Sequence, residues 1–166
     1  YVGVGPRLVV LDVADPRAPR MVAQSSPMPG VVHDVAVSAG HVYMAAGNAG
    51  MRVIDVTNPQ SPVEVGFVET SGQAEVIRVD GIHAYVAGIE SASPDGSMVS
   101  RLRVIDVTSP TAPREVGFVD MPGWAQGISV VDGIAYVAAG WTGLRVIDVT
   151  TPGAPRVVGS LETPGW

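Results

Sequence analysis

The side chains best suited to acid–base chemistry in this sequence are His33, Asp34 and Glu75. An imidazole and two carboxylates can act as general acid and general base when they converge on one substrate. His33 and Glu75 each stand three residues after a glycine that recurs along the chain, and Gln126 occupies that position a third time. A hydrolase-like enzyme is therefore one hypothesis. The sequence has no nucleophile elbow and no ordered Ser-His-Asp set, which favours the other hypothesis, a site that binds without catalysis.

Composition excludes several other kinds of site. The 166 residues include no cysteine, and all ten basic residues are arginine, which rules out thiol catalysis and lysine Schiff bases. His33, His41 and His83 are too dispersed for a helical zinc motif, and no calcium-loop string occurs, so we expect no metal and no cofactor. The formal charge of −6 and the lack of a basic cluster argue against nucleic acid. No run approaches the roughly 18 apolar residues of a membrane span, so we expect no membrane insertion.

A repeated unit must position the candidate residues, and it is the dominant feature of the chain. The stretch LRVIDVTSPTAPREVGFV (102–119) occurs in four variants, whose aspartates are Asp12, Asp55, Asp106 and Asp148. Their spacings are 43, 51 and 42 residues. A period of about 42 residues lies in the range of β-propeller blades. The long step indicates an insertion, which falls at 89–101.

Each unit is predicted to form four short antiparallel strands. In the second unit these cover 31–38, 41–46, 51–57 and 63–70, with turn residues between them. Asp80-Gly81 and Asp132-Gly133 mark the first hairpin of the next two units, and no segment has a helical period. We therefore expect one all-β domain over 1–166. Its units are 1–29 (lacking the inner strand), 30–71, 72–122 (with the insertion) and 123–166.

Two charged positions recur in the units and are predicted to be structural. The motif aspartate precedes a P-x-x-P turn, where a short carboxylate can accept backbone N–H groups. The arginine three residues earlier, found at Arg52, Arg103 and Arg145, points to the opposite face of the strand from that aspartate. We expect it to pair across strands or between blades. The P-x-x-P segments could also be SH3-type ligands, but their recurrence at identical offsets favours turns.

The units LVVLD, MRVID, LRVID and LRVID, their P-x-x-P turns, and segments such as Pro122-Gly123-Trp124-Ala125 resemble LVIVD-repeat β-propellers. The resemblance covers essentially the whole chain, apart from the insertion and Val9, where the other units have arginine. It implies propeller blades, a secreted or cell-surface protein, and no catalytic residues. Three whole units and one partial unit fit part of a larger ring, a ring completed by a second copy, a four-bladed ring with a vacant strand, or a filament.

In a propeller the inner strands begin at the mouth of the central channel, so the polar candidates should share one face with two tryptophans and the insertion. The predicted binding set is His33, Asp34, Glu75, Asp95, Trp124, Gln126 and Trp141. We expect this face or the open blade edges to bind a protein partner or further copies of the chain, with a glycan or a peptide as other ligands. A merely solvated channel mouth is the simpler alternative. The turn Pro94-Asp95-Gly96 indicates that the insertion extends a hairpin, either to bind a ligand or to pack against a neighbouring domain.

Overall fold

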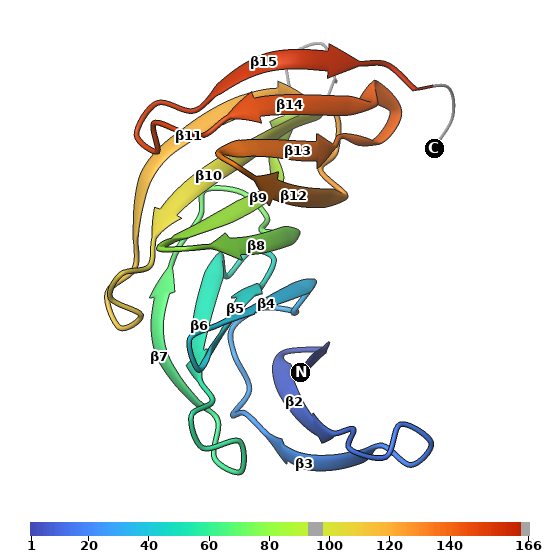
Figure 1. The fold of residues 1–166 in the computed structure, drawn as a ribbon, viewed down its shortest axis with the longest axis vertical. Coiled ribbons are helices and arrows are strands. Elements are labelled where there is room, and N and C mark those ends of the chain that lie inside the picture. Colours follow the sequence, from blue (N-terminus) through green and yellow to red (C-terminus); the bar gives the residue numbers. More distant parts are fainter. Residues whose placement is uncertain (93–97, 164–166) are drawn as a thin grey trace.

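A computed structural model describes residues 1–92 and 98–163, and it confirms the predicted all-β propeller architecture. Four antiparallel sheets follow one another along the chain and form an open arc (Figure 1). We call these sheets blades 1 to 4. Within each blade, strands that are consecutive in sequence are also neighbours in the sheet.

The strand bounds repeat from blade to blade. Blade 1 has three strands: β1 (Val2–Val4), β2 (Arg7–Asp12) and β3 (Arg20–Gln24). Blade 2 has four: β4 (Asp34–Ser38), β5 (His41–Ala45), β6 (Met51–Asp55) and β7 (Val63–Val68). Blade 3 has β8 (Val76–Asp80), β9 (His83–Ala92), β10 (Met98–Asp106) and β11 (Arg114–Pro122). Blade 4 has β12 (Gly127–Val131), β13 (Ile134–Ala138), β14 (Leu144–Asp148) and β15 (Arg156–Leu161).

Turn chemistry fixes the first hairpin of the blades. Ala39 and Gly40 both have positive φ, 46° and 76°, and Asp132 and Gly133 repeat this with 50° and 75°. Two successive residues with positive φ form the turn whose twist matches antiparallel strands. In the part of the chain that the structure describes, helix is limited to the short 3-10 turn η1 (Gly140–Thr142). That turn is far too short to cross a membrane.

The strands predicted for the second unit form with shifted ends, and hydrogen bonds explain two of the shifts. β4 begins at Asp34, later than predicted, because the Val32 N–H bonds to the Gly5 carbonyl of blade 1 at 2.8 Å and so leaves the ladder. β6 ends at Asp55, earlier than predicted, because the Asp55 carboxylate captures the Thr57 N–H at 2.8 Å. The extended hairpin predicted for the insertion is confirmed, since β9 and β10 are longer than their counterparts in blades 2 and 4.

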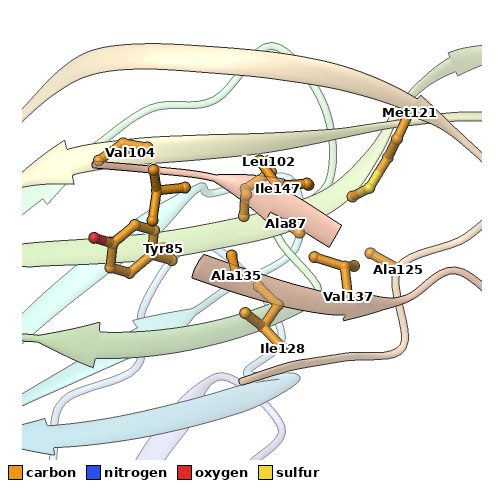
Figure 2. Close-up of a cluster of buried hydrophobic side chains, with 11 residues drawn as sticks. Tyr85, Ala87, Leu102, Val104, Met121, Ala125, Ile128, Ala135, Val137 and Ile147 are labelled. Atoms are coloured by element: carbon orange, nitrogen blue, oxygen red, sulfur yellow. The ribbon is translucent and has the colours of Figure 1, made fainter. Parts of the chain in front are cut away.

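The hydrophobic core lies between successive blades. Each of three buried clusters fills the space between one blade and the next. Figure 2 shows the cluster between blades 3 and 4, where Tyr85, Leu102 and Val104 face Ala135 and Ile147. Each blade therefore has two apolar faces. We call them the previous-blade face and the next-blade face, after the neighbour that each one meets.

Candidate functional site

His33, Glu75 and Gln126 lie at equivalent places in three successive blades, each just before the inner strand. Their backbone N–H groups bond to the carbonyls of Ala45, Ala87 and Ala138, at 2.8, 3.0 and 2.8 Å respectively. The inner strands β4, β8 and β12 lie side by side along the concave edge of the arc (Figure 1). We call the edge at which they begin the channel mouth.

The channel mouth brings two of the predicted site residues together. The His33 Nδ1 and Glu75 Oε2 atoms are 3.9 Å apart, although 42 residues separate them in sequence. The Glu75 side chain is mostly buried, whereas that of His33 is more open to solvent. Gln126 is exposed in the next blade. The pair can donate and accept hydrogen bonds, and it carries an ion pair when His33 is protonated.

Asp34 has a structural connection that the sequence did not reveal. Its Oδ1 accepts the Val35 N–H at 2.9 Å. Its Oδ2 accepts the Ile77 N–H at 3.0 Å and a guanidinium N–H of Arg78 at 2.8 Å, and both donors lie on the inner strand of blade 3. The carboxylate therefore links blades 2 and 3. Its role in ligand binding stays a prediction.

The two predicted tryptophans, Trp124 and Trp141, belong to blade 4, whereas His33 belongs to blade 2. Trp124 is half-buried beside η1, and its indole N–H is buried without a hydrogen-bond partner among the described residues. Trp141 is exposed on η1. Asp95, the remaining predicted site residue, lies outside the described residues, as does most of the turn expected around it. Their functional roles stay predictions.

A hollow of about 360 Å³ opens beside His33, and its lining includes Pro6, Val31, Asn48 and Gln73. Sequence reasoning did not select Asn48 or Gln73. The signal for Asn48 was its place in the glycine-rich loop GNAG, between two strands that open toward the channel mouth. Neutral amides with one imidazole suit hydrogen bonding to an uncharged ligand more than acid–base chemistry. Within residues 1–92 and 98–163, no cluster of three potential metal ligands occurs.

The recurrent aspartates accept backbone hydrogen bonds, as predicted. In the last unit the Asp148 carboxylate receives the Thr150 N–H at 3.0 Å and the Thr150 hydroxyl at 2.6 Å, and Arg156 donates to its other oxygen at 2.8 Å. The Thr150 hydroxyl, Arg156 and the Thr150 amide together hold the pKa of Asp148 at about 2. The motif aspartates of the other three units also accept the N–H two residues ahead, and their pKa values are lowered as well.

The recurrent arginines are buried, and two of them pair across strands as predicted. Arg52 bonds to Glu64 at 3.1 Å. Arg103 pairs with Glu90 from the insertion, and its Nε lies 3.6 Å from an oxygen of Glu115. Arg145 instead donates to the Thr142 carbonyl at 2.8 Å. These arginines make ion pairs and hydrogen bonds within their own blades, and they therefore belong to the scaffold.

The sequence model of the LVIVD repeat matches residues 29–70 and 122–163, which together make up more than half of the chain. The chain belongs to the LVIVD repeat family. The two matched segments correspond to blades 2 and 4, whose units are not interrupted by the insertion. No curated protein matches the chain.

The arc of LVIVD blades leaves an apolar face open at each end. On the next-blade face of blade 4, Tyr136 is 41% exposed, whereas the equivalent Tyr43 and Tyr85 of blades 2 and 3 are 2% and 4% exposed. Val158 and Leu161 lie on the same face and are also exposed. On the previous-blade face of blade 1, Val13 is 61% exposed, while its equivalents Val56, Val107 and Val149 are at most 6% exposed.

Proposed function

We propose that this protein is a non-catalytic binding and assembly module of a secreted or cell-surface protein, and that its open blade faces are the binding surfaces. The observation that carries the proposal is the exposure of Tyr136, Val158 and Leu161. Their equivalents in blades 2 and 3 pack against a following blade. Contiguous exposed apolar surface is a feature of protein interaction sites.

The surroundings of the polar candidates support binding rather than turnover. Catalysis by acid and base needs two groups that are free to approach the same substrate. One oxygen of Asp34 already serves Ile77 and Arg78 in the contact between blades 2 and 3. His33 and Glu75 remain close to each other at the channel mouth. We propose that they contribute hydrogen bonds to a bound peptide or glycan.

A secreted or surface location is part of the same proposal and is supported by the resemblance to surface LVIVD proteins. Fractionation of cells that produce the protein tests it. Recovery in the medium or on the cell surface would agree with the proposal. Retention of all the protein inside the cell would contradict it.

Self-association measured by light scattering tests the open-face proposal. The wild-type chain should gain mass with concentration, because the exposed apolar face of one copy can pack against an exposed apolar face of another. Tyr136→Glu should reduce this gain by placing a charge on the next-blade face of blade 4. Ile82→Glu is the control, since Ile82 is also an exposed apolar residue (54%, against 41% for Tyr136) but lies in a hairpin turn between β8 and β9. A wild-type chain that stays monomeric at every concentration would contradict the proposal, and so would an equal effect of both variants.

A further inference from the structure

The hollow beside His33 is bounded by loops from three successive blades. Pro6 belongs to the loop between β1 and β2, Asn48 to the loop between β5 and β6, and Gln73 to the segment that precedes β8. The volume of the hollow is about 360 Å³, and small-molecule sites usually occupy about 300–1,000 Å³. The hollow is therefore large enough for one small organic ligand.

Main-chain hydrogen bonds between blades hold the walls of the hollow in place. The Val32 N–H donates to the Gly5 carbonyl at 2.8 Å, which joins blade 2 to the loop before β2. Gly47 and Ala74 exchange two hydrogen bonds of 3.0 Å, which join the loop between β5 and β6 to blade 3. A ligand that enters such a preformed site does not have to order these loops, and this lowers the entropic cost of binding.

The polar side chains at the hollow have hydrogen-bonding groups to spare. The side-chain amides of Asn48 and Gln73 make no hydrogen bond to another residue in the described part of the chain, and both residues are exposed. The His33 imidazole lies over Gly47, with its Nε2 atom 3.2 Å from the place that a Cβ would take there. Each amide has N–H donors and a carbonyl acceptor, and a neutral imidazole has one donor and one acceptor. Three side chains therefore offer donors and acceptors together.

The lining of the hollow selects against a charged ligand. His33 is its one ionisable residue, and it includes no carboxylate and no guanidinium. A charged ligand would therefore lack a strong ion-pair partner, and an unpaired charge is costly to remove from water. Pro6, Pro29 and Val31 add apolar contact, and Val31 is 55% exposed.

We propose that this hollow binds a neutral sugar residue of a glycan. Hydroxyl groups donate and accept hydrogen bonds, as the side-chain amides of Asn48 and Gln73 do. A sugar ring carries several hydroxyls and also has apolar C–H faces that can contact Pro6, Pro29 and Val31. The inference rests on the proposed binding function, and it narrows the ligand of the channel mouth from a peptide or a glycan to a neutral glycan.

A peptide fits the hollow less well, because extended peptides bind chiefly through main-chain hydrogen bonds. Both main-chain groups of Gly47 are already bonded to Ala74. The main-chain N–H groups of His33 and Gln73 also donate to carbonyls within the protein, each at 2.8 Å. Recognition therefore depends on the side chains at the hollow, and these match hydroxyl groups.

A glycan array tests the choice of ligand. The array presents glycans that end in neutral hexoses or N-acetylhexosamines, together with their charged counterparts, the uronic acids and the free hexosamines. We expect the protein to bind at least one neutral glycan, and to bind its charged counterpart at least tenfold more weakly. Failure of every neutral glycan to bind would overturn the inference, and so would equal binding of the charged counterpart.

Nuclear magnetic resonance then locates the bound sugar. Titration with the neutral sugar that the array identifies should shift the side-chain NH₂ signals of Asn48 and Gln73. The signals of Asn58 and Gln60 are the matched control, because these two residues lie in the turn between β6 and β7 and outside the hollow. Equal shifts of all four signals would contradict binding at the hollow.

Variants of the two amides measure their contribution. Asn48→Ala and Gln73→Ala should each weaken binding of the sugar about fivefold, because each removes hydrogen bonds to it. Both variants should fold normally, which circular dichroism checks, and Gln60→Ala should bind as the wild type does. Unchanged affinity when both amides are removed would overturn the inference. Tyr136→Glu should alter self-association and leave sugar binding unchanged, so failure of this inference and failure of the open-face proposal can be recognised separately.

Discussion

Replacing Glu90 by alanine should destabilise the fold, because this residue of the insertion neutralises a buried charge. The Arg103 side chain is 5% exposed and that of Glu90 is 15% exposed. Removing one partner of a buried ion pair lowers the free energy of unfolding by about 3–5 kcal/mol. Arg103 keeps Glu115 at 3.6 Å, so we expect the lower end of that range, about 3 kcal/mol. For a chain of this length the corresponding fall in Tm is about 6–12 °C.

Urea unfolding and thermal melting, both followed by circular dichroism, measure the effect of Glu90→Ala. The double variant Glu90→Leu with Arg103→Met should recover most of the lost stability, because it removes both charges and leaves apolar groups in their place. Arg114→Ala is the control. It breaks an ion pair with Asp106 in which the Arg114 side chain is 74% exposed, and it should leave the melting temperature unchanged. A loss of stability below about 1 kcal/mol for Glu90→Ala would refute the reasoning, since removing one of the two carboxylates beside the buried Arg103 should cost more than that.

Two further predictions concern the recurrent and the candidate carboxylates. The pKa of Asp148 is about 2 in the folded chain and about 3.9 when unfolded. Its contribution to the stability of the fold is therefore present above pH 4 and is lost as the pH falls toward 2. Calorimetry should show that the stability of Asp148→Asn falls less steeply with acid than that of the wild type. Asp34→Ala should lower the free energy of unfolding by about 1–3 kcal/mol, because it leaves the Ile77 N–H without its acceptor. Hydrogen exchange at the Ile77 amide should accelerate, and an unchanged exchange rate would contradict this role of Asp34.

Local sequence signals determined the strands of this protein. Turn residues and β-branched residues recur with the same spacing, and each strand needs only its nearest neighbours along the chain to form. For this reason the four-stranded blades, the extended hairpin of the insertion and the structural roles of Asp148 and Arg52 could be predicted. The ends of β4 and β6 differed from expectation. Next to these ends the Val32 N–H donates to the Gly5 carbonyl and the Thr57 N–H donates to the Asp55 carboxylate.

The candidate site was harder to predict, because its contacts join residues from different units. The offset after the recurring glycine placed His33 and Glu75 at equivalent positions, and the proximity of adjacent inner strands brings their side chains to 3.9 Å. The same offset could not reveal that Asp34 serves Ile77 and Arg78 of the next blade. It also could not select Gln73, which reaches the hollow beside His33 from the following unit.

The sequence by itself determined the repeat, the order of the strands and the faces on which apolar side chains alternate, because these depend on period and on turn chemistry. Only the tertiary structure decided which of those apolar faces are covered. Tyr43, Tyr85 and Tyr136 occupy the same position in their units, yet only Tyr136 is exposed. The physical reason is that burial depends on the neighbouring blade, and blades 2 and 3 have a following blade in the arc, whereas blade 4 is at its open end.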